Sequence, residues 1–430
     1  MDNFDVIVVG GGLAGLSAAY CLAKAGIGVL VVERGDYSGA KNVTGGRLYL
    51  NPIRNLLPDI WEQAPLERFV TKECIVMMGE SSSMAIELSS GKFGQKPYHS
   101  YTIMRAKFDQ WLADKVMEAG GMVITKNRVD DLIMDGSKVR GIIAGEDKIP
   151  ANVVLAADGV MSLVAEKAGL RQRQKPMDYA VAIKEVIELS PQTIEQRFNL
   201  EPGAGTARMY AGAITDGMFG GGFLYTNLNS ISLGLVVRIK DLMEKQPPIE
   251  TPQLFENFKQ RPEIKGLIAG GETIEYSAHV IPEAGMDGIG RLYGDGILVA
   301  GDAAGLALNT GITVRGMEFA IASGVMAARA IITATGKKDF SSQSLAEYEK
   351  LLKESFVLKD METFKKAPHF LDNPRLMGRY PQFVCDALEN LMFIGEQPKK
   401  RLVGTAITEV RKKLKFTQML KDGYNAFRSM

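Results

Sequence analysis

The chain has 430 residues, 51 basic and 50 acidic side chains, and a formal net charge of +1. At about 150 residues per domain, this length suits two or three domains, and a hydrophobic fraction of 46% excludes a disordered or fibrous chain. The balanced charge argues against nucleic acid as the main partner, because a nucleic-acid-binding domain carries a basic surface.

Cysteine and histidine are rare, with three of each. Cys21, Cys74 and Cys385 lie far apart and form no CxxC pair, so we predict no metal site and a reducing compartment. An iron–sulfur cluster takes about four thiolates, which this chain alone does not supply. The apolar segments 4–32 and 297–336 are interrupted by glycines or charges, so we expect peripheral membrane contact rather than a transmembrane helix.

The start of the chain predicts a strand, a tight turn, a helix and a second strand. Residues 6–9 form an apolar run that is typical of a buried parallel strand. Gly10, Gly12 and Gly15 then form a GxGxxG motif, which allows the turn, the approach of a pyrophosphate and close helix packing. Glu33 lies 18 residues after Gly15, where a carboxylate binds the ribose of a dinucleotide. We predict an FAD or NAD site here; a glycine turn without a ligand is the alternative.

Two later segments also run from an apolar strand into a glycine turn. One strand leads into Asp158-Gly159 and the other into Gly301-Asp302, which a long helical pattern follows. Asp302 could accept hydrogen bonds from ribityl hydroxyls, and the helix after it would direct its positive end towards a flavin. An Asp-Gly pair alone is as often a plain turn, which remains the alternative for Asp158. Three such turns in this order favour FAD.

The order of these turns resembles the flavoprotein fold shared by para-hydroxybenzoate hydroxylase, geranylgeranyl reductases and electron transfer flavoprotein–quinone oxidoreductases. Residues 1–335 are most similar to the FixC branch of the quinone oxidoreductases. The similarity rests on the segments GAKNVTGGRLY (39–49), GMFGGGFLYTNLNSISLGLVV (217–237), GGETIEYSAHVIPEAG (270–285) and GLALNTGITVRGMEFAIASGVMAA (305–328).

The resemblance implies an α/β fold: a Rossmann-like FAD-binding domain of the glutathione-reductase type, an inserted β-rich substrate domain and a helical C-terminal region. We expect the domains at these ranges: a discontinuous FAD-binding domain at 1–75, 100–170 and 280–340, a quinone or substrate domain at 76–99 and 171–279, and the helical region at 341–430.

The resemblance also implies a function. Electrons from a two-subunit electron transfer flavoprotein (FixA and FixB type) would pass through FAD to a membrane quinone. A separate ferredoxin-like iron–sulfur subunit (FixX type) is implied, since this chain lacks the four cluster cysteines of longer relatives. The protein would be cytoplasmic and peripherally associated with the cytoplasmic membrane. The alternatives are an isoprenoid reductase like geranylgeranyl reductase, a flavin monooxygenase, and an electron-relay subunit that is inactive alone.

The predicted cofactor-binding residues combine the three turns with positions implied by the resemblance. They are Gly10, Gly12, Leu13, Ala14, Gly15, Glu33, Arg34, Lys41, Gly45, Gly46, Arg105, Val129, Ala157, Asp158, Gly159, Gly301, Asp302, Gly311, Ile312 and Thr313. A surface arginine at a helix start is the alternative for Arg105. We predict no catalytic side chain, because electron transfer depends on cofactor orientation and potential.

We expect a glycine-rich apolar stretch to form the quinone and membrane side. Its residues are Met218, Phe219, Phe223, Leu224 and Tyr225. Glycine lets the backbone approach a ring closely, and the apolar side chains could form a rim that enters the bilayer. A buried strand with a bulge is the alternative. We expect structural roles for the three histidines, which are His99, His279 and His369. Of these, His279 lies nearest the expected quinone side.

The C-terminal region predicts helices. Residues 345–364 have apolar positions at helical spacing, typical of an amphipathic helix. Residues 396–430 carry nine basic against three acidic residues. That charge fits docking on anionic lipid or on an acidic partner subunit, and a solvated helical face is the alternative.

Overall fold

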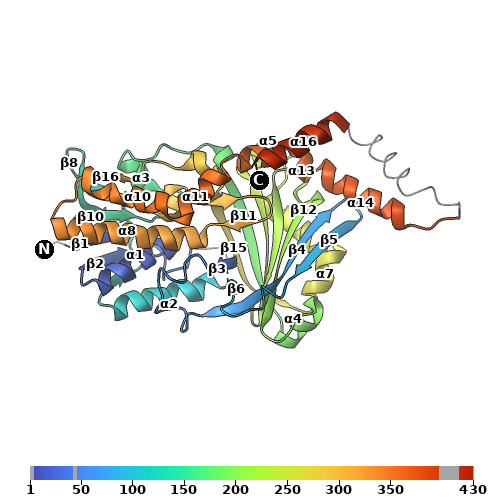
Figure 1. The fold of residues 1–430 in the computed structure, drawn as a ribbon, viewed down its shortest axis with the longest axis horizontal. Coiled ribbons are helices and arrows are strands. Elements are labelled where there is room, and N and C mark those ends of the chain that lie inside the picture. Colours follow the sequence, from blue (N-terminus) through green and yellow to red (C-terminus); the bar gives the residue numbers. More distant parts are fainter. Residues whose placement is uncertain (1–3, 42–45, 397–415, 430) are drawn as a thin grey trace.

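Two large sheets dominate the computed structural model, which describes residues 4–41, 46–396 and 416–429 (Figure 1). The first sheet has eight strands in the order β16-β17-β10-β1-β2-β7, with β9 paired to β10 and β8 to β9. Its strands are β1 (Phe4–Val9), β2 (Val29–Val32), β7 (Met122–Ile124), β8 (Asp131–Asp135), β9 (Lys138–Ala144), β10 (Asp147–Ala156), β16 (Tyr293–Gly294) and β17 (Ile297–Val299).

The centre of the first sheet is parallel. Strand β1 pairs in parallel with β2 on one side and with β10 on the other, and β17 continues the parallel order beyond β10. Residues Val6 to Val9 are buried on both faces, which explains why β1 is a continuous apolar run rather than an alternating one. The carboxyl ends of these strands therefore meet at one edge, where ligands bind in parallel sheets.

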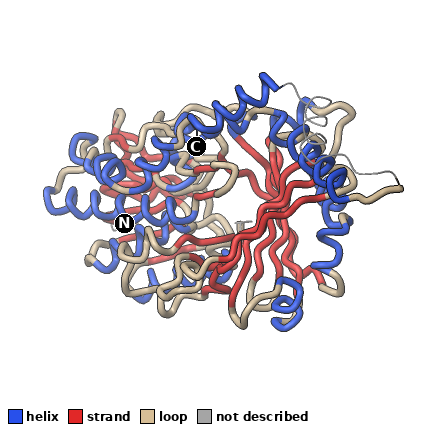
Figure 2. Tube along the Cα trace, turned by 45° about the vertical axis from the view of Figure 1, so that its right-hand side comes forward, coloured by secondary structure: helices blue, strands red, loops and turns tan. Residues whose placement is uncertain are grey.

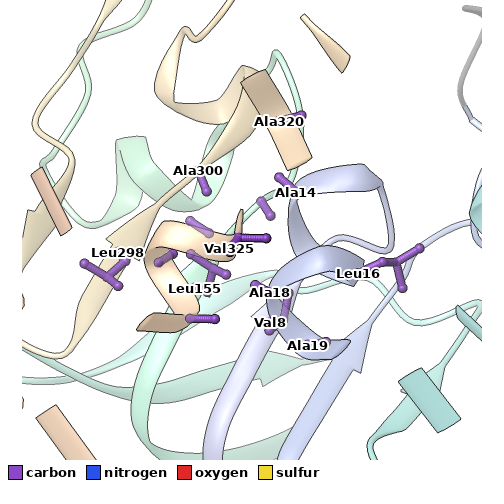
Figure 3. Close-up of a cluster of buried hydrophobic side chains, with 14 of the residues drawn as sticks. Val8, Ala14, Leu16, Ala18, Ala19, Leu155, Leu298, Ala300, Ala320 and Val325 are labelled. Atoms are coloured by element: carbon purple, nitrogen blue, oxygen red, sulfur yellow. The ribbon is translucent and has the colours of Figure 1, made fainter. Parts of the chain in front are cut away.

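Helices α1 (Leu13–Lys24), α2 (Arg105–Glu118) and α8 (Met317–Lys337) pack together beside this sheet. Small residues let α1 and α8 approach closely: a Cβ atom on Gly324 would lie 2.1 Å from the carbonyl oxygen of Ala14. Figure 3 shows how the two helices pack, with Ala14 and Ala18 of α1 near Ala320 and Val325 of α8. The close approach places the N-termini of both helices at the same edge of the sheet.

Helix α8 is, among the described residues, the one helix long and apolar enough to cross a membrane. However, 72% of its most apolar window is buried inside the protein. It also carries the buried charged residue Glu318 and packs on α1. In this fold α8 is therefore a core helix.

The second sheet has nine strands in the order β15-β11-β14-β13-β12-β4-β6-β3, with β5 paired to β4, and it fans out in Figure 2. Its strands are β3 (Gly46–Tyr49), β4 (Leu66–Met78), β5 (Ser83–Ser89), β6 (Ser100–Ile103), β11 (Tyr179–Glu188), β12 (Ala204–Gly212), β13 (Gly220–Thr226), β14 (Ser230–Arg238) and β15 (Glu272–Pro282). A short hairpin, β18 (Leu308–Asn309) with β19 (Val314–Arg315), stands apart from both sheets.

Helices α4 (Pro191–Phe198), α6 (Thr251–Gln260) and α7 (Pro262–Ile268) cover one face of the second sheet. Under α6, the side chains of Phe255 and Phe258 pack in an apolar core with those of β13 and β14. The opposite face is turned to the first sheet and lines a cavity.

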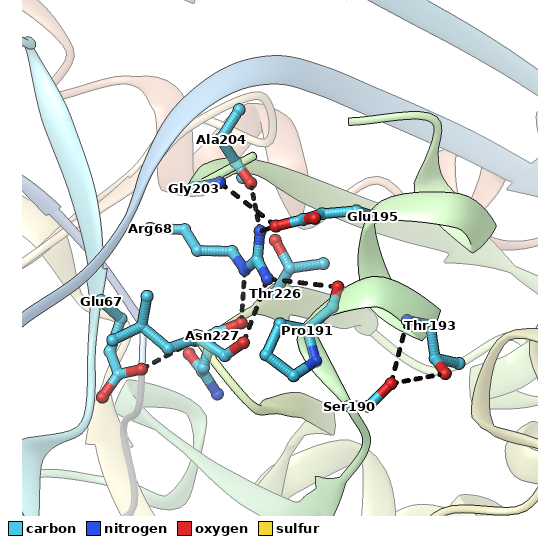
Figure 4. Close-up of polar contacts among 12 residues, drawn as sticks. Glu67, Arg68, Ser190, Pro191, Thr193, Glu195, Gly203, Ala204, Thr226 and Asn227 are labelled. Carbon is cyan, nitrogen blue, oxygen red and sulfur yellow. Dashed lines mark hydrogen bonds and ion pairs between the residues drawn. The ribbon is translucent and has the colours of Figure 1, made fainter. Parts of the chain in front are cut away.

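A buried arginine, Arg68, stabilises one end of the second sheet (Figure 4). The Arg68 guanidinium donates to the carbonyl oxygens of Asn227, Ala204 and Leu228 at 2.7, 3.0 and 3.0 Å, and to the Glu195 carboxylate at 2.8 Å. Buried charges are stable only when paired and hydrogen-bonded, as here. Arg68 thus ties β4 to β12, to α4 and to the loop between β13 and β14.

The strand pairing bears on the expected domain division, which stays a prediction. Residues 46–49, 66–75 and 100–103 were expected within the FAD-binding pieces, but their strands β3, β4 and β6 pair inside the second sheet. The pairing supports moving these short segments to the substrate domain.

The C-terminal region is helical, as predicted. The expected helix at 345–364 is divided into α10 (Glu347–Glu354) and α11 (Phe356–Thr363), preceded by α9 (Ser342–Leu345). The division falls at Ser355, whose hydroxyl accepts a hydrogen bond from the Val357 amide and so caps α11.

The remaining helices are α3 (Leu163–Lys167), α5 (Ile239–Glu244), α12 (Ala367–Leu371), α13 (Pro374–Met377), α14 (Arg379–Met392) and α16 (Phe416–Ser429). Most of the basic segment at 396–430 lies outside the described residues. Within this segment the structure describes only Glu396 and α16.

Candidate functional site

A cavity of about 570 Å³ lies between the two sheets. One wall is formed by the carboxyl ends of β1, β2, β10 and β17 and by the turns that follow them. The other wall is the open face of the second sheet, contributed by β12, β13, β14 and β15. Three turns that are far apart in the sequence therefore open into one space.

The first turn requires glycine at two positions. Gly10 has φ +108°, and a Cβ atom there would lie 2.2 Å from the carbonyl oxygen of Ala157. A Cβ atom on Gly15 would lie 2.1 Å from the carbonyl oxygen of Gly10, so its absence lets α1 pack on the turn. No side chain caps the N-terminus of α1 at Gly12. The first amides of α1 and the positive end of its dipole are therefore available to an anion.

Glu33 is held at the end of β2 by backbone amides. Its Oε2 accepts from the Gly11 amide at 2.7 Å and its Oε1 from the Gly35 amide at 2.6 Å. Each carboxylate oxygen has a further lone pair for a hydroxyl donor. Arg34 and Lys167 also line the cavity. This arrangement fits the ribose and phosphates of a dinucleotide.

Asp158, in the second turn, has an unused hydrogen-bond acceptor. Its Oδ2 accepts from the Val164 amide at 3.0 Å, whereas its buried Oδ1 has no partner. Burial raises the pKa of Asp158, and the charge of Arg171 works against this rise. A buried acceptor without a donor is costly, so a polar ligand in the cavity would relieve it.

Two arginines interact electrostatically with Asp302, in the third turn. Burial raises the pKa of its carboxyl, and the charges of Arg105 and Arg171 oppose that rise. Arg105 is itself held by two hydrogen bonds of 2.8 and 2.7 Å to the Asp109 carboxylate. The Arg171 guanidinium donates to the carbonyl oxygens of Asp302 and Ala303 at 3.1 and 2.6 Å, which fixes the turn.

The cavity brings together most of the predicted cofactor residues. Its lining includes Gly10, Gly12, Leu13, Ala14, Glu33, Arg34, Lys41, Gly46, Arg105, Val129, Ala157, Asp158, Gly159, Gly301, Asp302 and Gly311. Gly15 packs behind the turn, while Ile312 and Thr313 lie outside the lining. Gly45 lies outside the described residues. That these residues contact the cofactor stays a prediction.

The predicted apolar rim is only partly at the cavity. Met218 and Leu224 are buried in the core under α6, so they form no exposed rim, and for them the expectation of membrane contact was wrong. Phe219, Phe223 and Tyr225 line the cavity instead. Strand alternation explains the division within β13, because Leu224 points to the opposite face from its two neighbours.

Glycine in β13 allows close packing around the aromatic residues. A Cβ atom on Gly222 would lie 2.7 Å from the ring of Phe258, and one on Gly220 would lie 2.0 Å from the carbonyl oxygen of Val236. Both glycines line the cavity. The absent side chains thus make room for Phe258 of α6 and for the neighbouring strand β14, while Phe219, Phe223 and Tyr225 line the cavity.

The three histidines have different environments. Burial and the charge of Arg47 lower the pKa of His99 to about 4, and its Nε2 lies 2.7 Å from the Arg47 guanidinium. His279 lines the cavity, where burial and the charge of Arg105 lower its pKa. His369 pairs with Asp287 at the surface. In the described part of the chain, no cluster of His, Cys, Asp or Glu could hold a metal ion.

Several cavity residues were not predicted as site residues. Arg47 and Glu283 line the cavity, and Arg171 holds the third turn. Arg47 and Glu283 lie within segments that carry the family resemblance, and this resemblance could have identified them as site residues. Arg171 follows α3 and belongs to no motif, so no sequence pattern indicated its role.

Comparisons with known proteins identify the family. A FAD binding domain model matches residues 3–201, an ETF-QO ubiquinone-binding model matches 179–281, and an ETF-QO/FixC C-terminal domain model matches 367–430. The chain is 47% identical over 423 residues to Protein FixC of Escherichia coli K12, covering 98% of both chains.

The chain belongs to the ETF-QO/FixC family. Other members are also similar over most of their length. Identity is 44% to a probable electron transfer flavoprotein-quinone oxidoreductase, YdiS, of E. coli, covering 98% of both chains. It is 41% to Protein FixC of Azorhizobium caulinodans, covering 93% of this chain and 92% of the relative. The predicted family and the predicted FAD cofactor are confirmed, and the protein is a FAD-dependent oxidoreductase.

Solved structures confirm the predicted fold class. A geranylgeranyl bacteriochlorophyll reductase-like protein from Thermoplasma acidophilum has a TM-score of 0.74 at 24% identity, covering 99% of this chain and all of that one. The flavin-dependent brominase Bmp2 has a TM-score of 0.62 at 16% identity, covering 99% and 94%. At these identities the likeness shows the fold of this ETF-QO/FixC member and not its reaction.

Proposed function

We propose that the protein passes electrons from an electron transfer flavoprotein, through FAD, to a membrane quinone. One observation carries the proposal: the segment that matches the ubiquinone-binding model supplies one wall of the cavity, and the FAD turns supply the other. A quinone bound against the second sheet would therefore lie beside the cofactor. Such proximity is what electron transfer between two bound groups requires.

The residues of the first wall have separate roles in this proposal. The N-terminus of α1 at Gly12 would bind the pyrophosphate, and Glu33 would bind the ribose of the adenosine half. Asp302, with Arg105 beside it, would bind the ribityl chain, and Gly311 would lie at the ring. When bound, FAD supplies a centre that accepts and releases electrons.

The second wall would hold the quinone head. Phe219, Phe223 and Tyr225 offer flat apolar surfaces, and Gly220 to Gly222 let a ring approach the backbone. Quinone rings are planar and carry two carbonyl oxygens that accept hydrogen bonds. A wall of aromatic rings beside glycine backbone fits a planar ring.

Association with the cytoplasmic membrane is part of the proposal. Met392, Phe393 and Ile394, where α14 ends, are each more than 70% exposed. They directly precede the basic sequence segment, and apolar side chains next to cations favour anionic membrane surfaces. We therefore expect this end of the molecule, rather than β13, to contact lipid.

The partners in this scheme are a two-subunit electron transfer flavoprotein and a ferredoxin-like iron–sulfur subunit. The family relationship supports the first. The three cysteines of this chain support the second, because a cluster takes about four thiolates.

The test is anaerobic electron transfer with the FAD-loaded protein. Reduced electron transfer flavoprotein should reduce its flavin, and a short-chain ubiquinone or menaquinone should then reoxidise it. Onward transfer only after addition of the ferredoxin-like subunit would favour the relay alternative. No transfer to any quinone, even with all partner subunits and membrane vesicles present, would refute the proposal.

A further inference from the structure

Glu283 is a carboxyl group in the cavity to which the proposed FAD contacts assign no role. It directly follows β15 and lines the cavity with Pro282. Its Oε2 accepts a hydrogen bond of 3.2 Å from the side-chain amide of Asn309, and the Asn309 Oδ1 accepts one of 2.8 Å from the Gly311 amide. The carboxyl is therefore joined, through one side chain, to the loop assigned to the flavin ring.

A second, small cavity of about 30 Å³ adjoins this region. It shares Phe219, Leu371 and Met377 with the main cavity, so the two spaces are neighbours. Its polar lining includes Arg238 and Asp372. The space is large enough for a water molecule, and charged groups of this kind supply the hydrogen-bond partners that a buried water needs.

The charged groups of the small cavity connect it to solvent. Arg238 donates to the Asp241 carboxylate at 2.9 Å and also pairs with Asp372, whose side chain is half exposed. The guanidinium of Arg238 lies over the ring of Phe219, 5.0 Å from its centre. Charged side chains thus extend from the surface at Asp372 to Arg238, and the small cavity that they line meets the main cavity at Phe219, Leu371 and Met377.

The environment of Glu283 favours a carboxyl that can both hold and release a proton. Burial raises its pKa to about 7, while the Asn309 hydrogen bond and the charge of Arg238 oppose the rise. Asp241 and Asp372 offset the charge of Arg238, and Asp178 offers Glu283 only a backbone carbonyl, at 2.8 Å from the Glu283 amide. Groups with a pKa near the working pH are the most effective proton carriers.

We propose that Glu283 carries a proton from solvent to the quinone oxygen during quinone reduction. The inference rests on the proposed function. Conversion of a quinone to a quinol consumes two electrons and two protons. Bound FAD in its reduced form would supply both electrons and one proton, and the Glu283 carboxyl releases the other proton to the second quinone oxygen. The carboxylate then recovers a proton from water that enters past Arg238.

The substitution Glu283→Gln tests this role, because glutamine keeps an oxygen for the Asn309 amide but cannot release a proton at neutral pH. We expect the variant to retain FAD and to be photoreduced like the wild type, but to be reoxidised by a short-chain ubiquinone at least tenfold more slowly. In the wild type the reoxidation rate should fall as pH rises through about 7. The variant should lack this pH dependence.

Asp287→Asn is the matched control. Asp287 is an exposed carboxylate four residues further along the chain, and it is not part of the cavity lining. We expect this variant to be reoxidised at the wild-type rate with the wild-type pH dependence. Wild-type reoxidation in Glu283→Gln, with the same pH dependence, would overturn the proton role.

Infrared difference spectra supply a readout that does not depend on turnover. On photoreduction without quinone, the wild type should show a shifted carboxyl band that moves in D₂O, and Glu283→Gln should lack it. Absence of this band from the wild type would overturn the proposal even if the variant lost its FAD. A wild type that is never reoxidised by quinone would instead refute the proposed function.

Discussion

At the residue scale, three glycines of one motif contribute in different ways. At Gly10 and Gly15 a Cβ atom would collide with backbone atoms, so any side chain there would disturb the fold. Gly12 has φ −94°, which other residues adopt readily, and it faces the cavity. The absence of a side chain at Gly12 therefore leaves space for the ligand and is not needed for the backbone conformation.

This difference makes Gly12→Val a test of the cofactor site. We expect the variant to fold but to be colourless, because the valine side chain would occupy the space of the pyrophosphate. Asp302→Ala should also lose FAD, through loss of a ligand acceptor. The measurement is the flavin released per chain on denaturation, with Gly91→Val in an open loop as the control. Stoichiometric FAD in both variants would contradict the site assignment.

A second residue-scale prediction concerns acid stability through His99. Its pKa is lowered to about 4, so between pH 6.5 and 4 the unfolded chain binds a proton that the folded chain does not. The free energy of unfolding should therefore fall on acidification through this range, by about 1–2 kcal/mol for this partly exposed ring. Urea unfolding at pH 7 and 4.5 measures the loss. His99→Gln should show a smaller loss, and an equal loss in both proteins would refute the assignment.

At the scale of elements, one carboxylate joins the last described helix to the body of the protein. Asp422 of α16 is buried and accepts hydrogen bonds of 2.7 and 2.8 Å from Arg375 of α13, and a further one from Tyr380 of α14. The hydrogen bonds from Arg375 hold the pKa of Asp422 well below its usual range. Most of the other residues of α16 are exposed, so this cluster anchors the helix.

Asp422→Asn should therefore release α16 locally. Loss of charge-assisted hydrogen bonds costs about 1–3 kcal/mol, so amide hydrogen exchange in residues 416–429 should accelerate about tenfold or more. Exchange in α1 and α8 should stay unchanged, as should FAD content. Lys421→Gln, at an exposed neighbouring position, is the control. Unchanged exchange in α16 of Asp422→Asn would show that other contacts hold the helix.

At the scale of the whole molecule, the cofactor cavity has walls from both sheets. A ligand held there contacts the folded protein and not the unfolded chain, so it stabilises both halves together. Most strands of the second sheet have an apolar core of their own, whereas Leu48 of β3 and Ile103 of β6 belong to the core of the first sheet. We therefore expect bound FAD to add a further contact between the two sheets.

Removal of FAD should accordingly lower the thermal stability of the whole protein. At a free FAD concentration of 100 times Kd, binding contributes about 2.7 kcal/mol, which corresponds to a midpoint shift of about 3 °C for a chain of this size. Calorimetry of apoprotein with and without added FAD measures the shift. Gly12→Val should show no shift. An equal midpoint for loaded and unloaded wild type would argue against a site between the sheets.

Much of the cofactor wall could be predicted because its geometry is local. Gly10, Gly12 and Gly15, together with Glu33, are recognised from short-range steric and electrostatic requirements that leave a pattern in the chain. The same is true of the strand that leads into Asp302. The division of residues 345–364 into two helices was missed, although Ser355 is a good capping residue, because the apolar spacing continues across it.

The quinone side was harder to predict because strand alternation shows two faces but not which one meets the cofactor. Phe223 and Leu224 are adjacent and both apolar, yet only Phe223 lines the cavity, since α6 covers the other face. The sequence alone determined the family, the cofactor and the three turns, because these depend on short motifs in order. Only the tertiary structure decided that Glu283 and Asn309 meet, since long-range strand pairing and helix packing bring such residues together.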